Sequence, residues 1–318
     1  GTAAVLEAAH LFAGRTFEGL CPFHKEKTPS FSVDPDKGLY YCFGCHQGGD
    51  IFKFLMQTAR LSFAEAVEQL ARRYGVKLPP RSPDGERRRQ ESDKLRTLLE
   101  EAQAFFVDRL SGADGAAARR ELERRGFARA TWAEFGFGWA PDDWRQLTDE
   151  LGRRHPAGTL IAAGLSVQPD SRSSPYDRFR KRITFPIRSI DGRLVAFGGR
   201  ILGEGEPKYL NSPENPIFQK RSTLFCLERA RRPADEVGEL LVVEGYFDCL
   251  SLHRVGITNA VATLGTALTP DHARLLRRRL GGGDRVVLCY DADDAGRRAA
   301  MTGIRVLLEA GVDVAVLV

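Results

Sequence analysis

The sequence predicts a multidomain protein of the α+β and α/β classes, built from three unlike parts. Cysteines and a histidine gather near the N-terminus among short strand-like runs, and helix and strand patterns mix in the middle of the chain. From residue 239 onward, apolar strand-like runs alternate with helical runs, which is the pattern of a parallel sheet with crossover helices. A length of 318 residues suits about two or three domains.

The bulk composition is that of an ordinary globular protein, with 42% hydrophobic and 28% charged residues. No apolar stretch reaches the length of a membrane span, and the first residues lack the basic and apolar regions of a secretory signal. Because the chain begins with Gly1 instead of Met, we expect a fragment. The net charge of +5 is spread unevenly in arginine clusters, which is compatible with nucleic acid without establishing it.

The first part, residues 1–78, carries two pairs of metal-ligand residues. Cys21 and His24 form one pair, Cys42 and Cys45 form the other, and two residues separate the members of each pair. This spacing lets both side chains of a pair reach one tetrahedral cation, and four Cys and His ligands make a closed structural Zn²⁺ site. The remaining cysteines stand singly in apolar surroundings, where we expect small core residues: Cys226, Cys249 and Cys289.

Lysines and aromatic residues surround this zinc site. The aromatic residues that we expect to be exposed are Phe23, Tyr40, Tyr41 and Phe43. Such side chains suit single-stranded nucleic acid, through charge and through base stacking. The alternative is that the rings pack beneath the zinc ion and bind nothing.

A linker is predicted over residues 79–90, where Pro, Gly and Ser are frequent and apolar periodicity is absent. A charged helix is expected over about residues 86–110, with the apolar stripe Leu95, Leu98, Leu99, Ala102, Phe105 and Phe106. The second part, residues 91–235, is predicted to be a mixed α/β subdomain. Within it, residues 182–185 and 194–197 are typical of a hairpin, with Asp191 and Gly192 in the turn.

A basic segment, residues 178–182, precedes this hairpin, and a loop of residues 207–214 follows it. Arginine and lysine side chains near glycines suit the binding of a polyanion, since glycine lets a phosphate approach the backbone. The alternative is a solvated loop in which the glycines serve only the backbone.

The third part, residues 236–318, carries acidic residues after two apolar runs. Residues 240–243 stop at Glu244, and residues 286–290 stop at Asp291, with Asp293 two positions later. Ligand sites of open α/β sheets lie outside the carboxyl ends of the strands, so these carboxylates are predicted to converge. A divalent cation relieves their mutual repulsion, which predicts a Mg²⁺ site suited to phosphoryl chemistry. The alternative for residues 291–294 is a solvated turn that caps a helix.

Long segments of this sequence resemble the bacterial DNA primases of the DnaG type. The strings CPFHKEKTPSFSV and YYCFGCHQGGDIFKFLM are similar to the zinc-ribbon domain of that family. The string RFRKRITFPIRSIDGRLVAFGGRILGEGEPKYLNSPENPIF resembles the first part of its polymerase core. The strings LLVVEGYFDCLSLHRVGITNAVATLGTALT and VVLCYDADDAGRRAA resemble its TOPRIM fold.

This resemblance implies a nucleotidyltransferase, a DNA-directed RNA polymerase that starts short RNA primers on single-stranded DNA by two-metal-type nucleotidyl transfer. It implies Zn²⁺ at Cys21, His24, Cys42 and Cys45. It implies Mg²⁺ or Mn²⁺ at Glu244, Asp291 and Asp293, with Asp248 as a weaker candidate. For nucleic acid and nucleotides it implies Arg178, Arg180, Arg200, Lys208, Asn211 and Lys220.

The partners that the resemblance implies are a single-stranded DNA template, ribonucleoside triphosphates and the replicative helicase, which binds through a C-terminal domain absent here. We also expect single-strand binding protein as a partner, a monomer, and a place at the replication fork in the bacterial cytoplasm. Residues 312–318 look like the next TOPRIM strand and end before its acidic tip, so we expect an incomplete metal site and weak activity.

Three alternatives remain. The first is a TOPRIM nuclease or topoisomerase, which would share the acidic residues. The second is a primase–helicase fusion, for which this chain has no Walker A motif. The third is a single-strand binder that kept the fold without catalysis.

Overall fold

The computed structural model describes residues 16–59, 61, 63–78, 83–170, 174–230, 238–280 and 284–317. The chain forms two compact units, one of residues 1–80 and 231–238, the other of residues 81–230 and 239–318. Residues 79–82 of the predicted linker lie outside the described residues. In the part of the chain that the structure describes, no helix is both long enough and apolar enough to cross a membrane.

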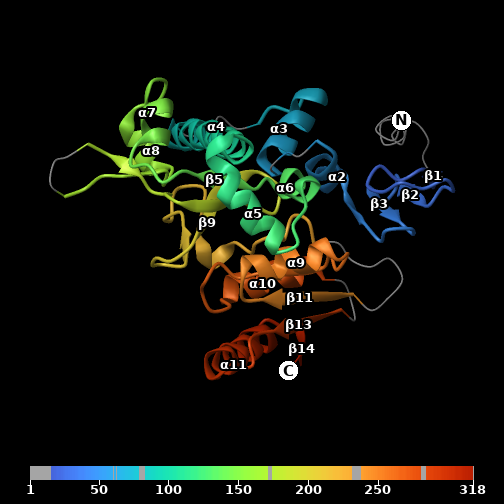
Figure 1. The fold of residues 1–318 in the computed structure, drawn as a ribbon. Coiled ribbons are helices and arrows are strands. Elements are labelled where there is room, and N and C mark those ends of the chain that lie inside the picture. Colours follow the sequence, from blue (N-terminus) through green and yellow to red (C-terminus); the bar gives the residue numbers. More distant parts are fainter. Residues whose placement is uncertain are drawn as a thin grey trace. The chain divides into compact units, whose positions relative to one another are not determined.

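The first unit is a small antiparallel sheet followed by two helices (Figure 1). Its elements are β1 (Phe17–Gly19), β2 (Phe31–Asp34), β3 (Leu39–Cys42), β4 (Gly48–Asp50), α2 (Ile51–Thr58) and α3 (Phe63–Arg73). The strands pair in chain order. The Asp50 carboxylate caps α2 by accepting a hydrogen bond from the Lys53 amide at 2.8 Å, which turns the chain from strand into helix.

The aromatic residues of this unit divide into two groups. Phe31, Tyr40 and Phe54 form a buried cluster, and the Phe23 ring packs against all three at 5.7–6.0 Å between centroids. The expectation that Phe23 and Tyr40 are exposed is therefore wrong, because the sheet has too few other apolar side chains to form a core without them. Tyr41 and Phe43 are exposed, at 41% and 67%, because alternate residues of a strand point to opposite faces.

The second unit begins with the long helix α4 (Pro83–Ser111), so the predicted linker is helical from Pro83 onward. All six residues of its predicted apolar stripe are buried, and the helix packs on β5 and β9 (Figure 1). Short helices follow: η2 (Ala113–Gly115), α5 (Ala116–Arg124), α6 (Arg129–Phe135), α7 (Gln146–Gly152) and α8 (Ala157–Ala162).

The predicted hairpin lies at the centre of an antiparallel sheet with the order β10-β9-β8-β5. The strands of this region are β5 (Gly138–Ala140), β6 (Ser166–Val167), β7 (Tyr176–Asp177), β8 (Arg182–Arg188), β9 (Leu194–Ile201) and β10 (Tyr209–Asn211), followed by η3 (Lys220–Ser222). β8 and β9 pair antiparallel, and their register shifts at Ile187 and Arg188. β6 and β7 form a separate two-stranded ribbon.

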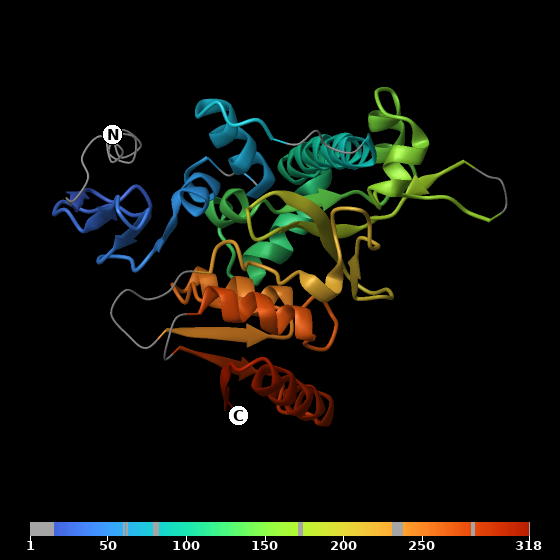
Figure 2. The ribbon, with the colours of Figure 1, turned by 180° about the vertical axis from the view of Figure 1, so that it is seen from behind.

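The predicted strand and helix alternation of the last part is confirmed. Its elements are β11 (Glu239–Val243), α9 (Tyr246–Arg254), β12 (Ala260–Ala262), α10 (Pro270–Arg279), β13 (Arg285–Cys289), α11 (Asp294–Glu309) and β14 (Asp313–Leu317). The strands form a parallel sheet with the order β12-β11-β13-β14, and the helices gather around it (Figure 2). The pairing of Val243 with Cys289 brings the carboxyl ends of β11 and β13 to the same edge.

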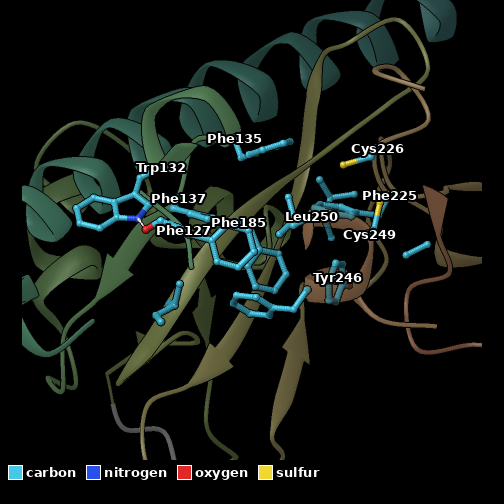
Figure 3. Packing of buried hydrophobic residues seen from close by; sticks show 14 of the residues in the cluster. Phe127, Trp132, Phe135, Phe137, Phe185, Phe225, Cys226, Tyr246, Cys249 and Leu250 are labelled. Carbon is cyan, nitrogen blue, oxygen red and sulfur yellow. Dashed lines mark hydrogen bonds between the residues drawn. The ribbon is translucent and has the colours of Figure 1, made fainter. Parts of the chain in front are cut away.

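One core joins the antiparallel sheet to this parallel sheet. Phe185 of β8 lies 4.5 Å from Tyr246 of α9, measured between ring centroids (Figure 3). The Phe247 ring meets Phe127 edge-on at 5.7 Å and stacks on Phe137 at 6.3 Å between centroids. These contacts fix α9, which begins two residues after Glu244. The multidomain α+β and α/β class is thus confirmed, whereas the predicted boundary between residues 235 and 236 lies outside the described residues.

Candidate metal centres and nucleic-acid interface

The four predicted zinc ligands come together in the first unit. The ligand atoms of Cys21, His24, Cys42 and Cys45 all lie within 4.8 Å of one another. The Cys21 and Cys45 sulfur atoms are 3.7 Å apart, and the Cys42 sulfur lies 3.9 Å from His24 Nδ1. A tetrahedral site with Zn–S bonds of about 2.3 Å has edges of about 3.8 Å between its sulfur ligands. The donor set and its spacing therefore fit zinc.

Backbone amides and a carboxylate hold these ligands in place. The Phe23 amide donates to Cys21 Sγ and the Cys45 amide donates to Cys42 Sγ, both at 3.4 Å. Glu26 lies 3.1 Å from His24 Nε2, which turns Nδ1 toward the sulfur atoms, as in other zinc sites with an oriented imidazole. Glu26 is a functional residue that the motif spacing did not reveal. The available signal was a carboxylate two positions after a ligand histidine.

Glu26 also connects the metal ligands to the strand β2. It accepts hydrogen bonds from the Cys21 amide at 2.6 Å and from the Ser30 hydroxyl, which in turn contacts Cys42 Sγ at 3.2 Å. The hydrogen bond from Ser30 is the largest effect that lowers the pKa of Glu26. Burial raises the pKa of Cys21 to about 12, so this thiol ionises readily only when a cation is present.

The acidic residues of the third part meet at the carboxyl edge of the parallel sheet. Glu244 follows β11 and its Oε1 accepts a hydrogen bond from the Asp291 amide, just after β13, at 3.1 Å. Asp293 caps α11 by accepting a hydrogen bond from the Gly296 amide at 2.7 Å. Asp248 lies in the first turn of α9, where partial burial of its carboxyl and then the nearby charge of Asp291 raise its pKa. Like charges are thus close together at this edge.

These carboxylates are less closely grouped than the zinc ligands. Among the described residues, the groups whose ligand atoms lie within 4.8 Å of one another do not include Glu244, Asp291 or Asp293. The Glu244 carboxylate contacts the backbone amide of Asp291, and the Asp293 carboxylate caps its own helix, so the convergence of the three carboxylates on one cation stays a prediction. Mg²⁺ binds through one or two carboxylates and keeps several waters, so this donor chemistry suits it. Which carboxylates bind a cation stays a prediction.

The predicted basic surface divides into exposed and internal side chains. Arg180 lies 4.0 Å from the ring of Trp144 and 5.0 Å from that of Tyr176, measured from the guanidinium carbon to the ring centroid. Lys208 is exposed beside Tyr209. Trp144, 63% exposed, was not singled out from the sequence, although a tryptophan in the polar stretch PDDWRQ was a usable signal. Arg180 and Trp144 together form a cationic stacking surface.

Other members of the predicted basic set are bound within the protein. Arg182 is 5% exposed and donates to the carbonyl oxygens of Pro207, Gly199 and Lys208, so the basic segment of residues 178–182 is not wholly a solvent-facing patch. A guanidinium has five N–H groups, enough to bind several otherwise unpaired carbonyls where strands end.

Arg178 and Asn211 stabilise the neighbouring loop. Arg178 donates to the Asn211 carbonyl at 3.1 and 3.0 Å. The Asn211 side chain accepts from the Tyr246 hydroxyl and donates to the Leu264 carbonyl at 2.9 Å. Burial is the main cause of a lowered Arg178 pKa. These contacts connect β10 with α9.

Arg200 and Lys220 complete the predicted set. Arg200 pairs with Glu121 at 3.3 Å, with both side chains mostly buried. Lys220 is half-buried in η3, where its carbonyl lies 2.8 Å from His272 Nε2. The binding of nucleic acid or nucleotides by Arg200 and Lys220 stays a prediction.

The sequence matches three known protein families in succession. Residues 8–85 match the CHC2 zinc finger, residues 105–231 match the N-terminal domain of the DNA primase catalytic core, and residues 241–318 match a Toprim-like domain. The cofactors of such a chain are Zn²⁺ for the zinc finger and Mg²⁺ for the Toprim-like domain.

Curated relatives agree with these matches. The DNA primase of Halalkalibacterium halodurans is 45% identical over 308 residues, which cover 95% of this chain and 50% of that protein. The DNA primase of Escherichia coli is 42% identical over 298 residues, covering 93% of this chain and 51% of that one. The chain thus spans about half the length of the curated relatives it matches.

Solved structures show the same fold. The zinc-binding and RNA polymerase domains of Aquifex aeolicus primase align with a TM-score of 0.64 and 36% identity, over 96% of this chain and 73% of that one. A DnaG primase catalytic domain bound to single-stranded DNA aligns with a TM-score of 0.65 and 39% identity, over 72% of this chain and 71% of that one. The chain belongs to the family of bacterial DNA primases of the DnaG type.

Proposed function

We propose that this chain contains the template-directed RNA polymerase of a DNA primase, which joins ribonucleoside triphosphates into short RNA primers on single-stranded DNA. The observation that carries the proposal is the contact between Glu244 and Asp291 at the carboxyl edge of the parallel sheet, in a chain of this family. Ligand sites of open α/β sheets lie at this edge. The place of action in the proposal is the replication fork in the bacterial cytoplasm.

In this mechanism Glu244 and Asp291 would hold divalent cations, with Asp293 and Asp248 beside them. The chemistry that bound cations would supply at the edge is neutralisation of triphosphate charge and activation of the attacking 3′-hydroxyl. The Asp291 amide holds Glu244 Oε1, which orients this carboxylate before substrate arrives. The raised pKa of Asp248, caused by burial and then by Asp291, is consistent with a site that a cation stabilises.

Template binding in the proposal involves both units. Arg180 with Trp144, and the exposed Lys208, would bind phosphates and stack on bases in the second unit. Tyr41 and Phe43 would offer exposed rings in the zinc-binding unit. Arg178, Arg200, Asn211 and Lys220 would support this surface, mainly by holding the segments that present it. A relative whose catalytic domain is bound to single-stranded DNA supports this assignment.

The partners in the proposal follow from the family. We propose that the replicative helicase binds through a segment beyond this chain, that single-strand binding protein meets the primase on the template, and that the chain acts as a monomer. None of these interactions involves the carboxylate edge, so the chemistry can be tested without them.

The test is unprimed RNA synthesis with labelled ribonucleotides, single-stranded DNA and Mg²⁺ or Mn²⁺, using this chain and a version extended past Val318. We expect Glu244→Gln to lower the yield of short oligoribonucleotides by about 100-fold or more, the size of effect that follows loss of one preorganised electrostatic group. Template affinity should be unchanged. Glu239→Gln is the matched control, because Glu239 begins the same strand β11 and pairs with Arg285 far from the edge.

Comparable primer yield from Glu244→Gln and from the unaltered chain would refute the role of this carboxylate. If neither length of chain makes RNA while both bind the template, the proposal of catalysis fails, and the single-strand binder becomes the better description.

A further inference from the structure

A second group of metal-ligand side chains lies inside the larger unit, made of residues that none of the sites described above uses. One ligand atom each from Cys226, Cys249 and His253 lies within 4.8 Å of the others. The three residues are 3%, 0% and 9% exposed. Among the described residues, this group and the zinc ligands are the two that meet this distance. Figure 3 shows both sulfur atoms on the same side of the aromatic core, near Phe225 and Leu250.

The fold brings these side chains together from two segments. Cys249 and His253 are four residues apart on α9, so they share one face of the helix. Cys226 follows Phe225, which forms a β-bridge to Ala262 next to that helix. Two thiols and one imidazole therefore meet where a loop passes over α9.

The backbone of Cys226 is in an unusual conformation for a cysteine. Its φ angle is 63°, in the left-handed region that favours glycine. A residue with a side chain is strained in this conformation, and the conformation places the thiol beside Cys249. Such backbone strain is common at binding and catalytic sites.

The hydrogen-bonding groups around these three side chains are those expected of a metal centre. His253 Nε2 lies 2.8 Å from the Ala260 carbonyl, which only an N–H can satisfy, so this nitrogen carries hydrogen and leaves the lone pair on Nδ1. A ring that donates to a carbonyl in this way is the usual arrangement of a metal-binding histidine. Glu228 Oε2 is buried nearby and has no hydrogen-bond partner among the described residues, and burial raises the pKa of this carboxyl.

We propose that Cys226, Cys249 and His253 bind a thiophilic divalent cation, with Zn²⁺ the one that suits two sulfur atoms and one nitrogen. Glu228 is outside the group whose ligand atoms lie within 4.8 Å of one another, so the three side chains leave a fourth position open. The cation would connect the loop at Cys226 to α9, the helix that follows Glu244. It would stabilise the sheet edge without taking part in the reaction there.

The test is the metal content of the reduced chain after refolding with Zn²⁺ or Co²⁺, since the buried site must fill during folding. We expect two equivalents by elemental analysis for the unaltered chain, one for Cys226→Gly and one for Cys45→Ser. Glycine at position 226 suits the backbone, so Cys226→Gly should fold. Cys289→Ala is the matched control. This half-buried cysteine belongs to neither group, and its variant should keep two equivalents.

Cobalt gives an independent measurement. The Cys45→Ser variant, which lacks the first site, should still show the sulfur-to-cobalt charge-transfer absorption of a tetrahedral thiolate site, and the added change Cys226→Gly should remove it. The proposal is overturned if the unaltered chain binds one equivalent and Cys226→Gly binds as much. It is equally overturned if a folded Cys45→Ser variant shows no thiolate absorption. Should Cys226→Gly not fold, His253→Gln must show the same loss of one equivalent.

Discussion

A buried carboxylate, Asp177, caps a helix that lies thirty residues earlier in the chain. It is 4% exposed and accepts hydrogen bonds from the Leu147 amide at 2.9 Å, from the Thr148 amide at 2.8 Å and from the Thr148 hydroxyl at 2.6 Å. Leu147 and Thr148 lie in the first turn of α7, whose own N-cap residue provides no side-chain hydrogen bond. Asp177 therefore satisfies amides that every helix leaves unpaired at its start.

The cost of Asp177→Ala can be worked out from these contacts. Two backbone amides lose their hydrogen-bond acceptor, and each buried donor left unpaired lowers the free energy of unfolding by about 1–3 kcal/mol. The Thr148 hydroxyl keeps its contact with Ser166 at 2.8 Å, so it adds little. Burial raises the pKa of Asp177 despite its hydrogen bonds, so part of the loss is offset because a charge is no longer buried. We expect the free energy of unfolding to fall by about 3 kcal/mol.

Urea unfolding and thermal unfolding, followed by the fluorescence of the buried tryptophans of the second unit, measure this change. About 3 kcal/mol should lower Tm by about 6–12 °C in a domain of this size. The control is Asp149→Ala. Asp149 lies on the same helix, its side chain is 58% exposed, and it pairs with Arg145 at 2.7 Å, so its loss should cost about 1 kcal/mol or less. If Asp177→Ala is no more destabilised than Asp149→Ala, the capping argument is refuted.

Three further predictions concern zinc, acid and packing. Cys45→Ser should lose the zinc of the first unit and its cooperative unfolding transition, while the second unit still unfolds normally in circular dichroism; a zinc content no lower than that of the unaltered chain would contradict the ligand assignment. The hydrogen bond from Arg124 lowers the pKa of Glu121 in the folded chain. The ionised Glu121 therefore stabilises the fold above the ordinary glutamate pKa, and this stabilisation is lost as the pH falls through the lowered pKa of the folded state. Unfolding measured at decreasing pH should therefore show a steeper loss for the unaltered chain than for Glu121→Gln, and equal slopes would contradict this. In Gly138→Ala the new Cβ would lie 2.4 Å from Phe106 Cβ, so we expect a loss of about 1–3 kcal/mol in the free energy of unfolding, and a neutral result would show that the helix can move away.

Much of the fold follows from patterns that span a few residues. Two residues separate the members of each metal-ligand pair, and the acidic residues follow directly after apolar strands, so both predictions needed only spacing. The apolar stripe of α4 follows from helical periodicity and is buried as predicted. Such features are local because the backbone period alone decides which side chains share a face.

The exposure of charged and aromatic side chains could not be predicted from such local patterns. Arg182 and Tyr40 were expected at the surface, and both are buried. Each is covered by a segment distant in the sequence, Arg182 by residues 207–208 and Tyr40 by the ring of Phe54. An arginine can bind a phosphate or a backbone carbonyl, depending on which loop covers it. The periodicity of the sequence does not predict which loop that is.

By itself, the sequence determined the order of the three parts, the zinc ligands and the strands that carry the acidic residues. Only the tertiary structure decided the capping of α7 by Asp177 and the meeting of Cys226 with Cys249 and His253. The physical reason is that spacing and periodicity act between neighbours in the chain. Burial and hydrogen bonding of polar groups depend on contacts between distant segments, which exist only once the chain has folded.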